Sequence, residues 1–393
     1  MSPALVARSP DLRRLRDEGY EIAVVGAHLV LSHVPYLTAN RQVKLGVLVA
    51  ELTLAGDTTV RPHTHVVRFA GEQPCNADGQ PLTKVINSPV HEQITPDLTV
   101  TFMFSSKPDT GYADYHELMT AYIAMLATHA AAVDPDATAR TYRVVTAAGT
   151  GSVFRYLDTA TSRAGITAAN ARLATDRIAI VGLGGSGSYL LDLLTKAPIE
   201  QIHLFDGDDL LQHNAFRSPG AVTLQQLQAR PKKVDHYAQM YAGLRDGIVA
   251  HPYFLDENNV GELDGMSFVF LCLDQGGPKR HLVQALERFG VGFIDVGMGL
   301  YLTDDHQVAG HLRTTTSVPA QRDHIWQQRL IPFDDAAADD YGSNIQIAEL
   351  NAFNAAQAVI KWKKLRGFYN DLGGEQHSVY AIAVNSLVTQ DTT

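Results

Sequence analysis

One glycine-rich segment constrains the fold of this 393-residue chain more than any other. Gly182, Gly184 and Gly187 stand in the G-x-G-x-x-G spacing, after the β-branched run Ile178–Val181 and before a helical stretch over Ser188–Thr195. This order is typical of a phosphate-binding turn, because glycine lets the backbone approach a phosphate and the helix start offers free N–H groups. A tight turn that binds nothing would use the same glycines, so the spacing leaves both interpretations open.

The chain around this turn alternates between strand and helix patterns. Ile202–Phe205, Ser267–Leu273 and Gly292–Val296 are short apolar runs, as expected of buried strands. Helical patterns separate or follow them over Leu224–Leu244 (with a break at Pro231), Lys279–Phe289 and Asn344–Leu365. Such alternation predicts a Rossmann-like α/β domain, in which helices wind around a mostly parallel sheet in doubly wound order.

The first part of the chain shows a different pattern. Helical segments are expected at Asp11–Glu21 and Tyr112–Val133, with strands between them at His28–Pro35, Lys44–Leu54, His65–Phe69 and Val100–Phe104. These elements predict a smaller α+β domain. The small, glycine-containing stretch Thr146–Ser152 marks the boundary, so we expect domains over residues 1–148 and 149–393.

Composition excludes several classes of protein. The formal charge of −10 argues against a general nucleic-acid partner. The N-terminus has no apolar signal-peptide region, and no apolar run reaches the roughly 18 residues of a membrane span. We therefore expect a cytoplasmic protein without a membrane partner. Two cysteines, Cys75 and Cys272, are too few for a disulfide framework or a cysteine-rich zinc site.

Asp206 ends the strand pattern that follows the glycine turn. In a dinucleotide-binding fold, an acid about twenty residues beyond the turn holds a ribose hydroxyl. NAD and ATP both carry such a hydroxyl. The turn and Asp206 together therefore leave an NAD(P)-dependent oxidoreductase and an ATP-using enzyme undecided.

The residues beyond Asp206 favour ATP. A dehydrogenase needs one acid here, whereas this chain adds several polar groups suited to a triphosphate: Asp208, Asn214, Arg217, the run Arg230-Pro231-Lys232-Lys233, and Asp274 at the end of an apolar strand. An acid at the carboxyl end of a strand lies at the ligand crevice of a wound sheet. Such acids can hold Mg²⁺, while arginine and lysine neutralise phosphate charge.

In this combination the chain resembles the ThiF/MoeB/HesA-type adenylyltransferases, the family of the ubiquitin-activating enzymes. The family motifs are matched in order by Arg155-Tyr156, the turn Gly182-Leu183-Gly184-Gly185-Ser186-Gly187, Asp206-Gly207-Asp208, Asn214, Arg217, Arg230-Pro231-Lys232 and Asp274. The resemblance covers about residues 150–300, and residues 348–385 more loosely. It implies ATP-dependent adenylation of the C-terminal carboxylate of a small ubiquitin-like or sulfur-carrier protein, with release of pyrophosphate.

The same resemblance implies roles for single residues. Asp206 would bind the ribose, Arg217 and Lys232 the phosphates, and Asp274 the Mg²⁺ that accompanies ATP. The glycines of the turn, including Gly185, together with Asp208 and Asn214 would line the nucleotide site. Arg155 is a candidate for the arginine that reaches the triphosphate across a homodimer. A homodimer is therefore expected as well.

The chain departs from the family at several positions. Asp158 stands where the family has the second arginine of R-Y-x-R-Q, so Arg155 or Arg163 would have to replace it. Residues 296–342 contain no cysteine, which excludes a thioester at the usual place. Cys75, in a polar segment expected to be exposed, is the remaining candidate, although an incidental cysteine is favoured over a reactive one. Cys272 is expected in the core.

Three further expectations complete the hypothesis. Lys233 is expected on the surface, because Lys232 already fills the motif. The pair His63 and His65 lacks a third metal ligand nearby in sequence, which disfavours a metal site there. The N-terminal domain is expected to recognise a partner, with a weak analogy to ubiquitin-conjugating folds. The alternatives to an adenylating enzyme are an NAD(P)-dependent oxidoreductase and a catalytically inactive dimeric scaffold.

Overall fold

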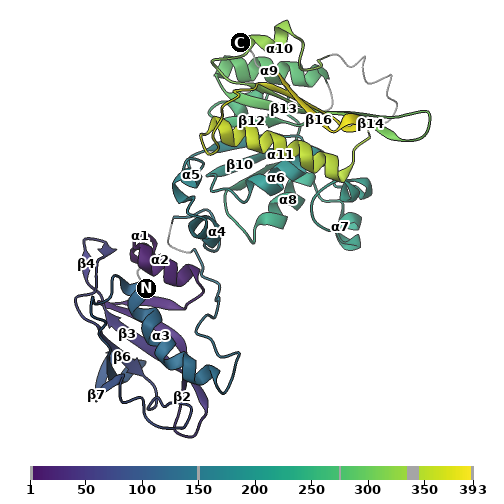
Figure 1. The fold of residues 1–393 in the computed structure, drawn as a ribbon. Coiled ribbons are helices and arrows are strands. Elements are labelled where there is room, and N and C mark those ends of the chain that lie inside the picture. Colours follow the sequence, from purple (N-terminus) through teal and green to yellow (C-terminus); the bar gives the residue numbers. More distant parts are fainter. Residues whose placement is uncertain (1–2, 148–150, 274–275, 334–344, 391–393) are drawn as a thin grey trace. The chain divides into compact units, whose positions relative to one another are not determined.

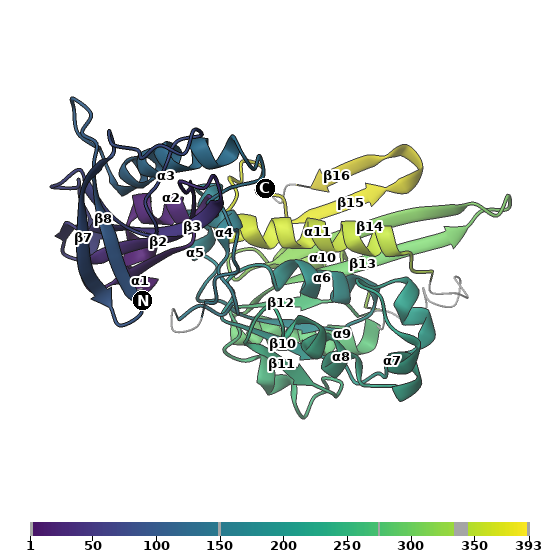
Figure 2. The same ribbon diagram turned by 90° about the horizontal axis from the view of Figure 1, so that it is seen from below.

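The computed structural model describes residues 3–147, 151–273, 276–333 and 345–390 (Figures 1 and 2). The chain divides into two compact units. The first comprises Met1–Thr150 and Tyr156–Gly165, and the second Gly151–Arg155 and Ile166–Thr393. Among the described residues, none of the helices combines the length and the apolar character of a membrane span.

The first unit is built on an antiparallel sheet in the order β1-β2-β3-β6-β8-β7. Its strands are β1 (Ile22–Val25), β2 (His28–Leu37), β3 (Val43–Glu51), β6 (Val66–Ala70), β7 (Ile86–Thr95) and β8 (Leu98–Ser105), and β4 (Leu54–Ala55) pairs separately with β5 (Thr58–Thr59). Its helices are α1 (Pro3–Arg8), α2 (Pro10–Asp17), α3 (Tyr115–Ala131) and α4 (Thr159–Arg163). The predicted α+β class of this unit is confirmed.

Helix α3 shows how local sequence sets an element of this unit. The Asp114 carboxylate accepts a hydrogen bond from the backbone N–H of Glu117 and so caps the helix start. Leu118, Tyr122 and Leu126 recur on one face and are buried against the sheet. The predicted segment Tyr112–Val133 is therefore a helix. The strands β1 and β7 were not expected from the sequence, because β1 is short and β7 carries several polar residues.

Cys75 is not in an exposed turn, so that expectation is wrong. Its side chain is 1% exposed, and its backbone N–H donates to the Leu37 carbonyl at 2.7 Å. Isolated bridges to Leu37 and Pro81 draw this polar segment against the sheet, which its sequence could not indicate. Burial raises the pKa of the Cys75 thiol. A raised pKa makes a thiol a poor nucleophile, which favours the incidental cysteine.

The histidine pair His63 and His65 contacts hydroxyl groups. His63 Nδ1 lies 2.8 Å from Thr53 Oγ1, and His65 Nε2 lies 3.0 Å from Ser105 Oγ. Within the ranges that the structure describes, no group of three or more histidine, cysteine or acidic side chains is arranged to hold a metal ion.

The second unit contains an eight-stranded sheet in the order β11-β10-β9-β12-β13-β14-β15-β16. The strands are β9 (Arg177–Val181), β10 (Gln201–Phe205), β11 (Ile248–His251), β12 (Phe268–Leu271), β13 (Gly292–Leu302), β14 (Val308–Ser317), β15 (His377–Ala381) and β16 (Ser386–Gln390). The strands from β11 to β13 are parallel, and β14, β15 and β16 continue the sheet in antiparallel pairs. The predicted mostly parallel α/β sheet is confirmed.

Helices cover both faces of this sheet. The helices are α5 (Thr167–Ala171), α6 (Gly185–Leu194), α7 (Leu224–Ala229), α8 (Lys233–Tyr241), α9 (Gly276–Phe289), α10 (Asp323–Gln327) and α11 (Ala348–Leu365), with short 3-10 helices η1 (Gln212–Phe216), η2 (Val260–Leu263) and η4 (Ile382–Val384). Ile178 and Ile180 pack with residues of α6, α8 and α11, whereas Ala179 and Val181 pack with residues of α9 and α10. Alternate residues of one strand thus serve two cores, which is the doubly wound arrangement.

The strand order reverses at β9. The chain proceeds outward from β9 to β10 and β11, and then returns to form β12 on the other side of β9 (Figure 2). Ligands of wound sheets bind where the strand order reverses in this way. The segments that leave β9 and β10 at this edge begin at Gly182 and Asp206.

A buried ion-pair group anchors α9 beside the same edge. The Asp295 carboxylate, on β13, is fully buried and lies 3.0 Å from Lys279 Nζ and 2.7 Å from an Arg313 guanidinium nitrogen. Burial alone would raise the pKa of the Asp295 carboxyl, but the two cations hold it below its ordinary value. Lys279 belongs to the first turns of α9, so this group fixes the beginning of that helix against the sheet.

Stability of the second unit should depend on pH through His377. Its ring, on β15, is buried and lies 2.9 Å from Thr315 Oγ1. Burial, followed by the nearby Arg313 and His324, lowers the pKa of His377 from 6.5 to about 4. As the pH falls below about 6.5, the unfolded chain binds this proton first, so the free energy of unfolding should fall by about 1–2 kcal/mol between pH 7 and pH 5.

This prediction can be measured by denaturant unfolding followed by tryptophan fluorescence. Both tryptophans, Trp326 and Trp362, lie in the second unit and report on it alone. His377→Gln should reduce the pH dependence by about this amount and leave the part that comes from His203, whose pKa burial also lowers to about 4, whereas His311→Gln, at an exposed position on β14, should leave the pH dependence as it is. An unchanged slope in His377→Gln would contradict the prediction.

Candidate functional site

The glycine turn is shaped partly by the chain itself. Gly182 has φ +91°, and a Cβ there would lie 2.5 Å from the Cys272 carbonyl oxygen. A Cβ at Gly187 would overlap the Gly182 carbonyl oxygen, and one at Gly185 would overlap the Asn351 side chain. These three glycines are therefore required by the packing of β9, α6 and α11. Cys272 itself is half-buried beside the core of the second unit, rather than fully inside it.

Gly184 is different from its three neighbours. It is the N-cap of α6 with extended backbone angles, and among the described residues a Cβ there would meet only the Gln346 side-chain oxygen, at 3.9 Å. Packing within the chain therefore does not require glycine at this position. The first turn of α6 begins beside it, with backbone N–H groups that have no acceptor within the helix. A bare backbone at this point suits a close-lying anion such as a phosphate.

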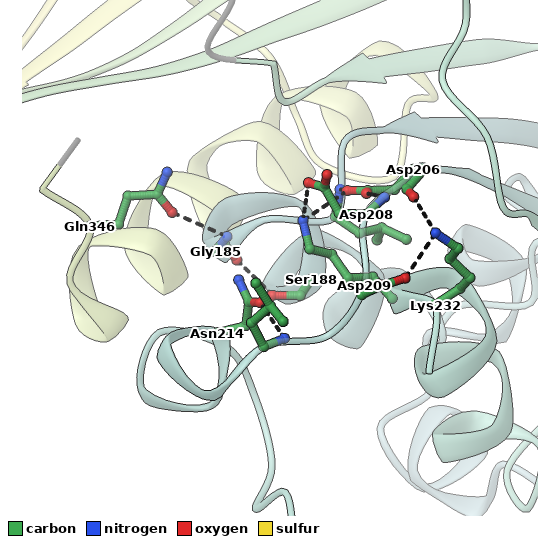
Figure 3. A network of polar contacts seen from close by, with 12 residues as sticks. Gly185, Ser188, Asp206, Asp208, Asp209, Asn214, Lys232 and Gln346 are labelled. Atoms are coloured by element: carbon green, nitrogen blue, oxygen red, sulfur yellow. Dashed lines mark hydrogen bonds and ion pairs between the residues drawn. The ribbon is translucent and has the colours of Figure 1, made fainter. Parts of the chain in front are cut away.

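The Asp206 carboxylate ties the turn to the neighbouring strand. Asp206 directly follows β10 and is buried; one of its oxygens accepts from the Leu183 backbone N–H at 2.6 Å, and the other from the Asp208 N–H at 2.8 Å (Figure 3). Lys233 Nζ lies 3.5 Å from the first oxygen. A carboxylate offers about four acceptor positions, so Asp206 keeps capacity for a further donor such as a ribose hydroxyl.

The structure places the two adjacent lysines differently from the sequence prediction, because Lys233 is the buried one and Lys232 is the more exposed. Lys233 is 6% exposed, and its Nζ lies 2.6 Å from an Asp208 carboxylate oxygen, so the prediction of a surface lysine is wrong. The Lys232 side chain is 41% exposed and reaches Asp209 and the Gly207 carbonyl, both at 2.8 Å (Figure 3). Its hydrogen bond to Asp209 raises the pKa of Lys232 and lowers that of Asp209.

The start of α8 explains the difference between the lysines. Pro231 precedes the helix, Lys232 is its N-cap, and Lys233 is its first residue. Helical side chains lean toward the N-terminus of their helix, which directs Lys233 back to the end of β10. The order of residues alone does not reveal which lysine occupies the first helical position.

Asn214 and Arg217 lie in and directly after η1. Asn214 is buried, and its side-chain oxygen accepts from the Leu211 N–H at 2.8 Å, so this residue shapes the loop. Arg217 Nε is buried and has no hydrogen-bond partner among the described residues. A buried donor without a partner is rare in folded proteins and is explained by a missing partner, for which an anion is the natural candidate beside this turn.

Two side chains from the far end of the chain join this site. The Gln346 side-chain oxygen accepts from the Gly185 N–H at 3.3 Å, and Asn351 on α11 contacts Ser186 Oγ at 3.0 Å and the Arg217 carbonyl at 3.3 Å. Neither residue was expected at the site from the sequence. The available signal was a polar residue, Asn351, on the buried face of a helix, but it did not indicate the partner.

One predicted residue, Arg155, is not placed with this group. Arg155 forms an ion pair with Asp246 at 2.6 Å and donates to the Ala242 carbonyl at 3.3 Å, beyond the C-terminal end of α8. It therefore lies at the amino edge of the sheet, opposite the glycine turn, within one chain. Asp158 caps α4 by accepting from the Thr161 N–H at 3.0 Å. Asp274, the predicted Mg²⁺ ligand, lies outside the described residues.

Comparison with known proteins adds two domain matches. Residues 159–309 match the ThiF family, and residues 10–159 match a domain of unknown function, DUF6791. A similar curated protein is the ubiquitin-like modifier-activating enzyme 5 of Oryza sativa subsp. japonica, 25% identical over 170 residues. That match covers 39% of this chain and 38% of the relative, so the chain spans well under half of the relative's length.

Similar solved structures include PaaA and an E. coli MccB structure with ATP. PaaA is 16% identical with a TM-score of 0.45, over 57% of this chain and 76% of PaaA. The MccB structure is 15% identical with a TM-score of 0.43, over 57% of this chain and 65% of MccB. From the domain matches, the chain contains a ThiF family domain over residues 159–309, preceded by a DUF6791 domain over residues 10–159.

Proposed function

We propose that the protein uses ATP to adenylate a carboxylate, and that this carboxylate is the C-terminus of a small ubiquitin-like or sulfur-carrier protein. The observation that carries the proposal is the direct hydrogen bond from the Leu183 N–H to the Asp206 carboxylate, which joins the turn proposed to bind phosphate to the acid proposed to bind ribose. Arg217, whose Nε has no partner within the ranges that the structure describes, and the two lysines add positive charge at the same edge. The ThiF family domain and the name of the similar activating enzyme support the same chemistry.

The proposed reaction asks the protein mainly to position groups and to neutralise charge. An oxygen of the acceptor carboxylate attacks the α-phosphorus of ATP, forming an acyl–phosphate bond. The bond from that phosphorus to the bridging oxygen breaks, and its electron pair leaves with pyrophosphate. The turn N–H groups would hold phosphate oxygens, Asp206 a ribose hydroxyl, and Arg217 the growing negative charge. Asp208 and Asn214 would shape the pocket rather than react.

Mg²⁺ is expected to accompany ATP, and Asp274 remains its proposed ligand. The described residues alone do not form a metal site, and both Asp206 oxygens already accept hydrogen bonds, so no step is assigned to the metal. The same hypothesis includes four further proposals. The protein would be a cytoplasmic homodimer, Arg155 would contact the triphosphate across the dimer, and the first unit would recognise the partner.

The proposed reaction should be visible as isotope exchange between pyrophosphate and ATP. We would supply the protein with a panel of small ubiquitin-like and sulfur-carrier proteins that end in glycine. Exchange should appear with a free C-terminal carboxylate and disappear when the same partner carries a C-terminal amide, because an amide cannot attack the α-phosphorus. Binding of NAD⁺ without ATP would instead support an oxidoreductase, and binding of neither nucleotide would support a scaffold.

The lysines should differ in their effect on the reaction. Lys233→Met leaves Asp206 and Asp208 uncompensated beside the ATP polyanion, so pyrophosphate exchange should fall about 100-fold or more. Lys232→Met removes an exposed ammonium paired with Asp209 and should cost about tenfold or less. Exchange rates of both variants, with tryptophan fluorescence as a folding control, check this prediction. A larger loss in Lys232→Met would show that Lys232 is the phosphate lysine after all.

Two glycine variants should separate ligand contact from chain packing. Gly184→Ala has room for its methyl group, so its unfolding midpoint should match the wild type, whereas its ATP affinity should fall about tenfold or more. Gly187→Ala would push against the Gly182 carbonyl and should lower both stability and ATP affinity. Thermal unfolding and calorimetric titration with ATP measure both quantities. Unchanged ATP affinity in Gly184→Ala would contradict a phosphate at this turn.

A further inference from the structure

An exposed aromatic ring lies beside the acid segment Asp206-Gly207-Asp208. Phe254 follows β11 and is 61% exposed, which is unusual for a large apolar side chain. A Cβ built on Gly207 would lie 2.7, 2.8 and 3.0 Å from three adjacent atoms of the Phe254 ring. The ring therefore lies directly beside the Gly207 backbone, while most of the Phe254 side chain remains open to solvent.

The backbone that carries Phe254 is held on both sides. The preceding Tyr253 hydroxyl lies 2.9 Å from His251 Nδ1 and donates to Glu262 at 2.8 Å. The following Leu255 is buried in the core beneath α9. The Phe254 carbonyl accepts from the Asn259 side chain at 3.0 Å. The exposed ring thus extends from a segment whose backbone is fixed by its neighbours. The fold itself therefore sets the position from which the ring extends.

The order of the strand ends matches the order of groups in a nucleotide. The glycine turn follows β9, the Asp206 carboxylate follows β10, and Phe254 follows β11, which are three neighbouring parallel strands. Neighbouring strands lie about 4.8 Å apart. A nucleotide with phosphates at the first strand end and its ribose at the second extends its base toward the third.

We propose that Phe254 is the stacking surface for the nucleobase, and that position 207 is glycine because any side chain there would displace the ring. This inference rests on the proposed function and adds a residue that decides nucleotide specificity. An aromatic face can stack on any base, and stacking on a single ring can raise the affinity for a nucleotide about tenfold. Purines offer the larger surface, so the site should prefer ATP to UTP.

The test is calorimetric titration of the full chain with ATP, UTP and inorganic tripolyphosphate. Phe254→Ala should weaken ATP binding about tenfold, reduce the preference for ATP over UTP, and leave tripolyphosphate binding unchanged. Phe254→Trp should retain ATP affinity, whereas Phe254→Leu, which keeps apolar bulk without an aromatic face, should not. Phe353→Ala, on the exposed side of α11, is the matched control and should bind all three ligands as the wild type does.

Gly207 gives an independent test through a double-mutant cycle. Gly207→Ala should weaken ATP binding by displacing the ring, but it should cost little more once Phe254 is already alanine. Additive losses of ATP affinity would show that Gly207 and Phe254 act separately. They would overturn the proposal that glycine at position 207 keeps the Phe254 ring in place.

The failure of this inference can be told apart from the failure of the proposed function. Wild-type affinity for ATP in Phe254→Ala, with pyrophosphate exchange intact in the wild type, would overturn the stacking role alone. Equal losses for ATP and tripolyphosphate in Phe254→Ala would also overturn it, because the variant would then act on the phosphates. A wild-type protein that binds no ATP would overturn the proposed function itself.

Discussion

The buried Asp206 carboxylate is the interaction on which the candidate site depends. An unpaired carboxylate in this position would cost several kcal/mol, because burial strips it of water. The N–H groups of Leu183 and Asp208 and the ammonium of Lys233 offset that cost. These partners come from the glycine turn, the acid segment and the start of α8, so one ionised group fixes three pieces of chain at the edge where the sheet reverses its order. The geometry of every neighbouring group follows from this junction.

Glycines around the junction serve two different purposes. Gly182, Gly185 and Gly187 are required because backbone and side chains of the protein itself occupy the space of a Cβ, and Gly207 because the Phe254 ring does. Gly184 has room for a side chain and remains bare at the N-terminus of α6. The sequence motif does not distinguish these glycines from one another. The atoms around each position distinguish the glycines that the turn itself requires from Gly184, where we propose that a ligand lies.

The charged groups of the site differ in whether they already have partners within the chain. The buried Lys233 ammonium pairs with the buried Asp206 and with the exposed Asp208, while Arg217 has a buried Nε without a partner among the described residues. A buried donor without a partner costs free energy, and an anion bound at this donor and at the nearby helix N-terminus would offset that cost. This balance is the physical basis for proposing phosphate binding rather than a purely structural turn.

The sequence by itself determined the wound sheet, the glycine turn between β9 and α6, and the position of Asp206 at a strand end. Those features are local, because glycine spacing, apolar periodicity and β-branched runs constrain neighbouring dihedral angles and the faces that must be buried. Only the tertiary structure decided that Lys233 lies inside while Lys232 is half-exposed, that Arg155 is at the opposite edge, that Cys75 is buried, and that Gln346, Asn351 and Phe254 adjoin the turn and its acid. The partners of these side chains come from elements distant in sequence. Their contacts follow from how strands and helices pack in space, which no local pattern of residues records.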